Sequence, residues 1–595
     1  MILHWLDWLS IIGFFVVSLA IGLSVARKAG SSSVEFFASG RNMPWWLLGV
    51  SMVATTFSSD TPNLVTDLVR THGVSGNWMW WAFLISGMVT VFIYARLWRR
   101  SGVLTDIEFY ELRYSGKAAA FLRGFRALYL GVFFNVMIMA TVSLAAIKIG
   151  GVILGFSPLK TILISSVIVV SYTMLGGLRG VLITDFVQFI IAMIGAVAAA
   201  VVAVNLPEVG SLGQLFAHES VRTKLSILPD FNDTSLVMSV FLIPIAVQWW
   251  AVWYPGSEPG GGGYVAQRML AAKNENHAMG ATFLFNIANF TLRPWPWIIV
   301  ALASIVVFPT LSSLQTAFPN IPADIIKHDL AYPAMLTFLP RGLLGMVVAS
   351  LIAAFMSTIS THLNWGASYI VNDFYKRFFG KEADEKQLVR VGRVSILILM
   401  ILAAAMALLL SNALQAFQIL LQIGAGTGLL FLLRWFWWRI NAASEIAAMV
   451  ISFCVALYFE FIHLRLGLPE LLAWQKLLIG VGITTAGWIL VTLVSKPTDQ
   501  KTLVSFYKVV EPGGPGWKRV IDEAEKNGMV AAGGLKRDWN LPQAILKVFL
   551  GLVLIYSVLF CVGFWLYGNT VPALITTACA IVAAAGLIVS WRKER

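Results

Sequence analysis

Apolar residues run along this chain in about fifteen segments of near twenty residues, separated by short polar or charged connections. An α-helix needs about 20 apolar residues to cross the hydrocarbon core of a bilayer. The pattern therefore predicts an all-α polytopic membrane protein. The expected spans are 5–26, 44–69, 76–98, 121–149, 158–176, 180–204, 235–256, 279–309, 340–371, 391–411, 413–438, 442–462, 472–494, 543–567 and 571–591.

Two of these spans are interrupted. The second contains Ser58-Ser59-Asp60-Thr61-Pro62, and the seventh ends in Tyr254-Pro255-Gly256-Ser257-Glu258-Pro259, followed by a run of glycine. The interruptions lie five spans apart, so the two segments cross the membrane in opposite directions. Such a pair predicts two antiparallel five-helix halves, an inverted repeat, with the solute site at the breaks. The alternative is two ordinary kinks, because Gly and Pro are common in membrane helices.

Composition supports the membrane assignment. Hydrophobic residues make up 58% of the chain, charged residues 12%, and the mean hydropathy is +0.78. The net charge of +13 does not indicate nucleic-acid binding, because the basic residues lie at segment ends and not along one face. Cys454, Cys561 and Cys579 lie in apolar runs and imply no disulfide framework. We expect a small molecule and the bilayer as partners, with no nucleic acid and no obligate protein partner.

Basic residues also predict the orientation. If the N-terminus is outside, most of the 43 Lys and Arg residues fall on the inner side, including Arg96, Arg99 and Arg100. Arg27 and Lys28 follow the first apolar run, which is read as a retained span and not as a signal peptide. The prediction is a multi-pass protein of the cell (inner or plasma) membrane with a cytoplasmic C-terminus.

The order of spans suggests a division of the chain into six parts. Residues 495–541 form the one sizeable hydrophilic connection, which is expected to face the cytoplasm and is too small to bury a core of its own. The expected parts are an N-terminal helix and inner loop (1–43), a first repeat (44–234), a second repeat (235–440), two additional helices (441–494), the cytoplasmic loop (495–541) and a C-terminal hairpin (542–595).

Hydroxyl and small residues form a stripe in the segment from Ser350 to Asn364. Ala354, Ser357, Thr358 and Thr361 follow the spacing i, i+3, i+4, i+7, which places them on one helix face. The stripe either packs helices, with each hydroxyl bonded one turn back, or offers oxygens to a small hard cation.

Asp185 lies near the inner end of the sixth span. It is either solvated at a helix N-terminal turn or part of a functional site, as intramembrane acids often are. If the two halves fold on each other, Asp185 approaches Ser357, Ser360 and Thr361 and completes a cation site.

Several polar and aromatic residues at the breaks are candidates for solute contact. Asp60 and Thr61 either meet the solute or cap the second half-helix. The aromatic residues of the other break either stack on a ring or belong to an interfacial belt; they are Trp249, Trp250, Trp253 and Tyr254.

A single charge stands within a later span. Arg293 is costly there, so Glu258, Asp60 or an anionic solute is the expected partner, and a structural ion pair is the plainer alternative. His362 is expected to pack and not to bind metal. The chain contains no HExxH, P-loop or G-x-S-x-G motif, and an enzyme is not expected.

Five stretches carry a family resemblance. They are Gly40-Arg41 with Trp46, Gly49, Ser51, Ala54 and Ser58; Thr105–Phe109 with Arg113-Tyr114; Gly176–Gln188; Gln267–Lys273; and Ala354-Phe-Met-Ser357-Thr358. Together they resemble the sodium:solute symporters, the family of sodium-coupled glucose, proline, sialic acid and iodide carriers. The resemblance extends over residues 1–440.

The resemblance implies a five-plus-five inverted-repeat core of the leucine-transporter type, with extra helices at both ends, and co-transported sodium ions. In the family, the shared sodium site uses oxygens of the first and eighth core helices, and some members hold a second sodium. The implied residues are Ala54, Phe57, Ala354, Ser357 and Thr358 for the shared site, and Asp185, Ser357, Ser360 and Thr361 for the second.

The departures from the family concern the solute. Sugar-carrying members have a glutamine in the first break and a glutamate in the second core helix, where this chain has Thr61 and Met79-Trp80. We predict a sodium-driven importer of a small sugar-like or carboxylate-bearing solute, a proton-coupled carrier or a membrane solute sensor being the alternatives. The residues expected to contact the solute are Ser58, Asp60, Thr61, Trp250, Trp253 and Arg293.

Overall fold

The computed structural model describes residues 3–29, 33–410, 413–531, 533–535 and 541–592. Its elements are helices, and the described residues contain no strand beyond two isolated bridges. Eleven of the described segments are long and apolar enough to cross a membrane. They are Val74–Ser101, Gly116–Leu154, Gly177–Val204, Thr234–Ala251, Glu275–Val307, Leu343–Phe378, Glu385–Ala407, Ala442–Ile462, Ala473–Val494, Leu541–Leu566 and Thr570–Arg592.

The remaining predicted spans correspond to other helices. The first corresponds to α1 (Trp5–Ala29), the second to α3 (Trp45–Thr56) and α4 (Asp60–His72), and the eleventh to α24 (Ala413–Gly424) and α25 (Gly428–Leu433). The fifth and sixth spans are the two arms of α11 (Pro158–Val204), which bends at Gly177. The φ of Gly177 is 52°, a left-handed conformation that glycine adopts without the Cβ clash of other residues.

Both predicted interruptions are present as non-helical backbone. α3 ends at Thr56 and α4 begins at Asp60, so the first break is only three residues long. The second is longer, because α15 (Trp249–Ala251) is followed by irregular chain up to α16 (Gly263–Ala271). Gly256, Gly260 and Gly261 have positive φ in this run, which favours glycine there.

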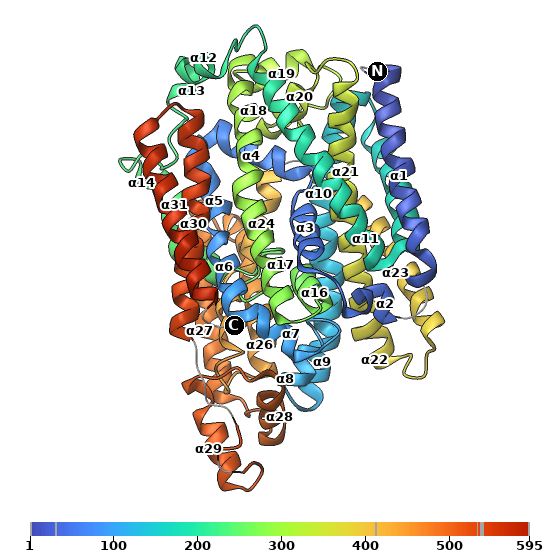
Figure 1. Ribbon diagram of the computed structural model, residues 1–595, viewed down its shortest axis with the longest axis vertical. Helices are drawn as coiled ribbons and strands as arrows, with labels where there is room; N and C mark the ends of the chain where they lie inside the picture. Colours follow the sequence, from blue (N-terminus) through green and yellow to red (C-terminus); the bar gives the residue numbers. More distant parts are fainter. Residues whose placement is uncertain (1–2, 30–32, 411–412, 532, 536–540, 593–595) are drawn as a thin grey trace.

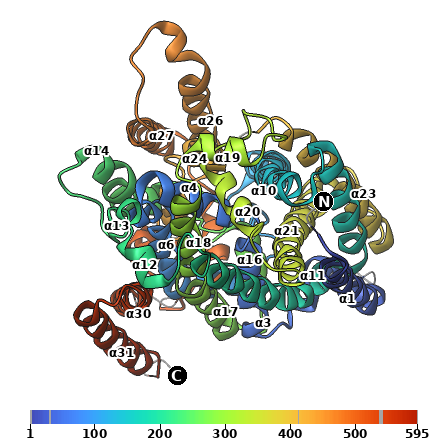
Figure 2. The ribbon, with the colours of Figure 1, turned by 90° about the horizontal axis from the view of Figure 1, so that it is seen from above.

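The helices pack into one bundle around these breaks (Figure 1). α11 lies along α21 (Leu343–Ser368), and α1 packs against both. Seen from above, the hairpin of α30 (Leu541–Leu566) and α31 (Thr570–Arg592) lies on one edge (Figure 2). α26 (Ala442–Leu457) and α27 (Ala473–Val494) lie on another edge (Figure 2).

The connection after α27 covers the end of the bundle that lies opposite the described N-terminal residues (Figure 1). It contains α28 (Gln500–Val510) and α29 (Lys518–Lys526). Trp517 is fully buried, its indole N–H donates to the Trp435 carbonyl at 2.9 Å, and the Arg113 guanidinium lies over its ring. The connection therefore packs on the bundle and has no core of its own.

Candidate functional site

The end of α3 meets the middle of α21 at a set of neutral oxygens. The hydroxyl of Thr358 donates to the Thr55 carbonyl at 2.7 Å and to the Ala354 carbonyl at 3.1 Å. Because α3 stops at Thr56, its last carbonyls lack the usual partner one turn later. Ala54, Phe57 and Ser357 lie at the same junction and are buried. Carbonyl and hydroxyl oxygens in irregular backbone are the donors that a small hard cation prefers.

A second polar cluster lies beside this junction and contains Asp185. The Asp185 carboxylate accepts hydrogen bonds from Ser357 at 2.6 Å and from Ser51 at 2.5 Å. α11 and α21 therefore bring together two residues that the sequence only suggested could meet. The hydroxyl of Ser360 donates to the Ser357 carbonyl at 3.1 Å and does not contact the carboxylate.

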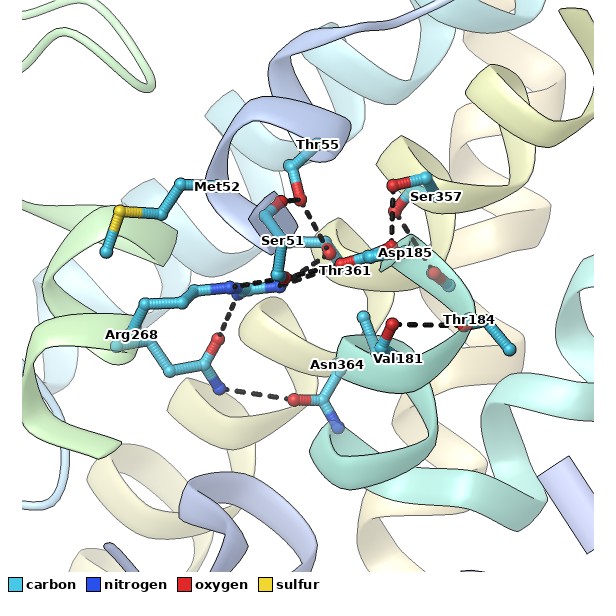
Figure 3. Close-up of polar contacts among 12 residues, drawn as sticks. Ser51, Met52, Thr55, Val181, Thr184, Asp185, Arg268, Ser357, Thr361 and Asn364 are labelled. Atoms are coloured by element: carbon cyan, nitrogen blue, oxygen red, sulfur yellow. Dashed lines mark hydrogen bonds and ion pairs between the residues drawn. The ribbon is translucent and has the colours of Figure 1, made fainter. Parts of the chain in front are cut away.

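Arg268 of α16 is the residue of this cluster that the sequence did not reveal. Its guanidinium lies 3.8 Å from Asp185 and donates to Thr361 at 2.8 Å and to Ser51 at 3.2 Å. Figure 3 shows the guanidinium between α3, α11 and α21, with Asp185 on its far side from α16. Gln267 accepts from the same guanidinium at 2.9 Å. A fixed cation therefore already lies within the set of oxygens expected to bind a second sodium.

The two breaks enclose a cavity next to the junction. Its volume, measured as the space open to the centre of a water molecule, is about 120 Å³. Four of the six predicted solute-contact residues line it: Ser58, Asp60, Thr61 and Arg293. The sequence did not single out most of the remaining wall, which includes Trp80, Phe83, Tyr264, Asn289, Phe290 and Phe417.

The other two predicted contacts do not line the cavity. The indole N–H of Trp250 donates to the Ala246 carbonyl one turn back. Trp253 is buried with its ring 4.9 Å from that of Phe134. Trp250 lies within α15 and its side chain is held one turn back along the helix, whereas Trp253 follows the end of α15 at Ala251, where the change of backbone direction takes its side chain off the cavity. Tyr254 is the aromatic residue of this run that lines the cavity.

Arg293 faces the cavity without a carboxylate partner. One of its terminal nitrogens donates to the Thr56 hydroxyl at 2.8 Å and to the Val53 carbonyl at 3.3 Å, and its Nε has no hydrogen-bond partner. Within the residues that the structure describes, neither Asp60 nor Glu258 lies within ion-pair distance of it. The expected structural ion pair is therefore not formed.

His362 also borders the cavity but is held by a neighbouring amide. Its Nδ1 lies 2.6 Å from Asn135 Oδ1. The described residues contain no group of three or more His, Cys, Asp or Glu side chains that could hold a metal ion together.

The sequence is similar to those of known membrane transporters. The sodium:solute symporter family model matches residues 36–452. A sodium/glucose cotransporter of Vibrio parahaemolyticus is 27% identical over 488 residues, which covers 78% of this chain and 87% of that protein. A sodium/mannose cotransporter of Bos taurus is 24% identical over 488 residues, covering 76% and 78% respectively.

The fold is also similar to that of a solved transporter. The substrate-bound, outward-open structure of a Na⁺-coupled sialic acid symporter superposes with a TM-score of 0.64 at 19% identity. The match covers 83% of this chain and 99% of the other. The chain accordingly has the five-plus-five inverted-repeat architecture that its two broken helices predicted.

Proposed function

Because the chain belongs to the sodium:solute symporter family, we propose that it imports a small carboxylate-bearing organic solute together with sodium by alternating access. Arg293 supports this solute class, because a buried guanidinium without a carboxylate partner faces the cavity. The Asp60 carboxylate lines the same cavity and acts on this guanidinium from beyond ion-pair distance, so no direct counter-ion offsets the cost of burying the charge. An anionic group on the solute would supply the missing partner.

In the proposed cycle, sodium acts at the junction of α3 and α21. An ion held by Ala54, Phe57, Ala354, Ser357 and Thr358 would join the end of α3 to α21, as the Thr358 hydroxyl already does. Loss of the ion to the inside would allow the two helices to part. Sodium can shift the equilibrium between the two states only through its different affinities for them.

A second sodium at Asp185, Ser357, Ser360 and Thr361 would have to share the cluster with Arg268. The guanidinium already neutralises the carboxylate and occupies the Thr361 hydroxyl. We therefore propose Arg268 as the resident cation of this cluster, and we assign one sodium ion to the shared site.

A sugar-like solute is the second candidate. Trp80 and Phe290 line the cavity and stack with their ring centroids 5.7 Å apart, and an aromatic wall suits the apolar face of a sugar ring. The two relatives given above are sodium/glucose and sodium/mannose cotransporters, and glucose and mannose are sugars. The N-outside orientation and the repeat boundaries, 44–234 and 235–440, stay predictions.

A thermal-unfolding screen of the purified protein separates these solutes. Carboxylates, amino acids and sugars are added one at a time, each with sodium and with choline as the control cation. A ligand at a hundred times its Kd stabilises the folded state by about 2.7 kcal/mol. We expect stabilisation by a carboxylate in sodium only, and its loss in Arg293→Gln. Stabilisation by sugars alone, unchanged in Arg293→Gln, would favour the second candidate.

A further inference from the structure

Glu258 is a buried acid in the middle of the second break. Only 3% of its surface is exposed, and neither carboxylate oxygen has a hydrogen-bond partner. The backbone N–H groups of Glu258 and Gly256 lie near the carboxylate, but neither meets the geometry of a hydrogen bond to it. A buried carboxylate without donors or a counter-charge is strongly destabilising unless a cation or a proton neutralises it.

The cavity next to Glu258 is lined by hydroxyl groups that already donate their protons to backbone carbonyls. The carboxylate lines a small cavity between the span Val74–Ser101 and α17 (Glu275–Ile287). The Ser86 hydroxyl donates to the Trp249 carbonyl, and the Thr282 hydroxyl donates to the Ala278 carbonyl at 2.9 Å. Both hydroxyl oxygens therefore keep only lone pairs for other contacts.

An amide completes this wall. The Asn286 side-chain nitrogen donates to the Thr282 carbonyl at 2.8 Å, and its Oδ1 occupies the space that a Cβ on Gly87 would need. Thr90 and Ser257 also line the cavity. Ser86, Thr282 and Asn286 thus line the cavity together with Glu258, and their oxygens are acceptors, which suits a small cation and not an anion.

The charged group that faces Glu258 is itself an acid. The Gly263 N–H donates to Asp106 at 2.9 Å, and a Cβ added to Gly263 would lie 2.7 Å from Glu258 Oε1. The two carboxylates therefore lie on either side of one glycine. Asp106 accepts from the Tyr369 hydroxyl, and the charges of Arg434 and Arg126 act on Asp106 and not on Glu258. No basic side chain of the described residues forms an ion pair with Glu258.

We propose that Glu258 binds a second coupling cation, a small hard one, either a sodium ion held among the acceptor oxygens or a proton on the carboxylate. The free space beside it, about 10 Å³ for the centre of a water-sized sphere, admits roughly one water and excludes larger ligands. Ser257 lines both this cavity and the solute cavity. A cation at Glu258 would therefore stabilise the irregular chain that forms one wall of the solute site.

The test counts cations on the purified full-length protein and needs no knowledge of the solute, although the proposal rests on sodium-coupled transport. One arm measures ²²Na⁺ bound per protein at saturation, and the other measures how the half-saturating sodium concentration depends on pH. Wild type is compared with Glu258→Gln and with Glu445→Gln. Glu445 is an equally buried acid, but it lies 3.3 Å from Arg434 and accepts from Tyr114 at 2.8 Å.

If the cation is sodium, Glu258→Gln binds one sodium ion fewer than wild type and Glu445→Gln binds the same number. If it is a proton, the count is unchanged, but the pH dependence of sodium binding is lost in Glu258→Gln alone. Equal counts and equal pH dependence in all three proteins would overturn the proposal. A wild type that binds no sodium would overturn sodium coupling as well.

A second variant covers the case in which Glu258→Gln does not fold. Thr282→Val removes one lining oxygen and keeps the side-chain shape. Its matched control is Thr141→Val, because the buried Thr141 hydroxyl only bonds the Met137 carbonyl one turn back at 3.0 Å. We expect Thr282→Val to raise the half-saturating sodium concentration, or to shift its pH dependence, by several-fold relative to Thr141→Val. No difference between the two variants would also overturn the proposal.

Discussion

Asp185 and Glu258 are two buried carboxylates at the centre of the same bundle, and their surroundings are opposite. Asp185 accepts from two hydroxyls and lies 3.8 Å from a guanidinium. Glu258 shares a small cavity with hydroxyl and amide side chains and lies near a second acid, Asp106. The difference shows that burial alone does not indicate the role of an acid. The group that neutralises its charge is the better guide to that role.

A fixed cation and an exchangeable one have different consequences for transport. The guanidinium of Arg268 belongs to the chain and cannot leave, so the Asp185 cluster can hold helices together throughout the cycle. A cation at Glu258 could enter and leave with each cycle. From these surroundings we propose that Asp185 is a structural acid and that Glu258 is a coupling acid.

The largest expected effect comes from removing the fixed cation. Arg268→Gln leaves Asp185 as a buried charge without a counter-charge, which should lower the free energy of unfolding by about 3–5 kcal/mol. Asp185→Asn in the same background should restore most of the loss, because the two residues then behave as one unit. Thermal unfolding of the four proteins without sodium measures this cycle.

The stability that sodium adds to Arg268→Gln and to wild type tests the same assignment of Arg268. With Arg268 replaced by glutamine, the free Asp185 carboxylate can attract sodium, so the variant should gain more stability from sodium than wild type does. If Arg268→Gln were as stable as wild type, the guanidinium would not be the counter-ion of Asp185, and a second sodium there would again be the better explanation.

The next effect concerns the shared sodium site. Thr358→Ala removes a hydroxyl that lies between α3 and α21. A hydrogen bond or contact to a charged group contributes about 1.5–3 kcal/mol, so the half-maximal sodium concentration for uptake should rise about tenfold or more. Thr141→Val serves as the control again. An unchanged sodium dependence at normal membrane expression would remove Thr358 from the site.

A smaller, several-fold effect is expected for thiol labelling in the second break. In a background without Cys454, Cys561 and Cys579, a cysteine at Ser257 should react with a small polar reagent, and sodium should slow the reaction. The protection should be weaker when Glu258 is also glutamine. A cysteine at Trp253 should react slowly in every condition, because that side chain is buried outside the cavity. Equal labelling at both positions would mean that the cavity wall is not as described.

The smallest effect concerns an acid at the aqueous edge, Glu111 in α8 (Phe109–Arg113). Partial burial opposes ionisation, but hydrogen bonds and charges from Arg377 and Arg123 outweigh it and lower the pKa of Glu111. A lowered pKa stabilises the fold above the unfolded value, near 4.3 for Glu. The contribution is lost as the pH falls through the folded value.

Glu111→Gln should therefore cost about 0.2–1 kcal/mol at neutral pH and almost nothing in acid. Thermal unfolding at both pH values, with and without high salt, measures the difference. A cost that persists in acid would indicate that the side chain acts through packing and not through charge.

Much of the fold could be predicted because lipid leaves a clear pattern in the chain. The apolar runs mark the spans. Pro62, which is tolerated in the first turn of a helix and lies in the first turn of α4, and the glycines after Pro259 mark the two breaks. The meeting of Asp185 with Ser357 could also be anticipated, because an inverted repeat faces those two segments towards each other.

The surroundings of the two acids could not be predicted in the same way. Arg268 is in a short helix after an irregular run, and helical periodicity does not extend through irregular backbone to fix its direction. The same loss of register turns Trp253 away from the cavity. Whether Glu258 has a partner depends on side chains from α17 and the span Val74–Ser101, which no local pattern relates to it.

The irregular run from Val252 to Gly262 also constrains how the chain is made. Lipid cannot satisfy polar backbone that is outside a helix, so this stretch has no stable place in the bilayer as it leaves the ribosome. In the folded chain the run lies against α17 and pairs at Trp253 with the Gly424 carbonyl, so its polar backbone is satisfied only after those later segments have been synthesised. We therefore expect this run to reach its final position late in biogenesis, after the later helices that contact it have been inserted.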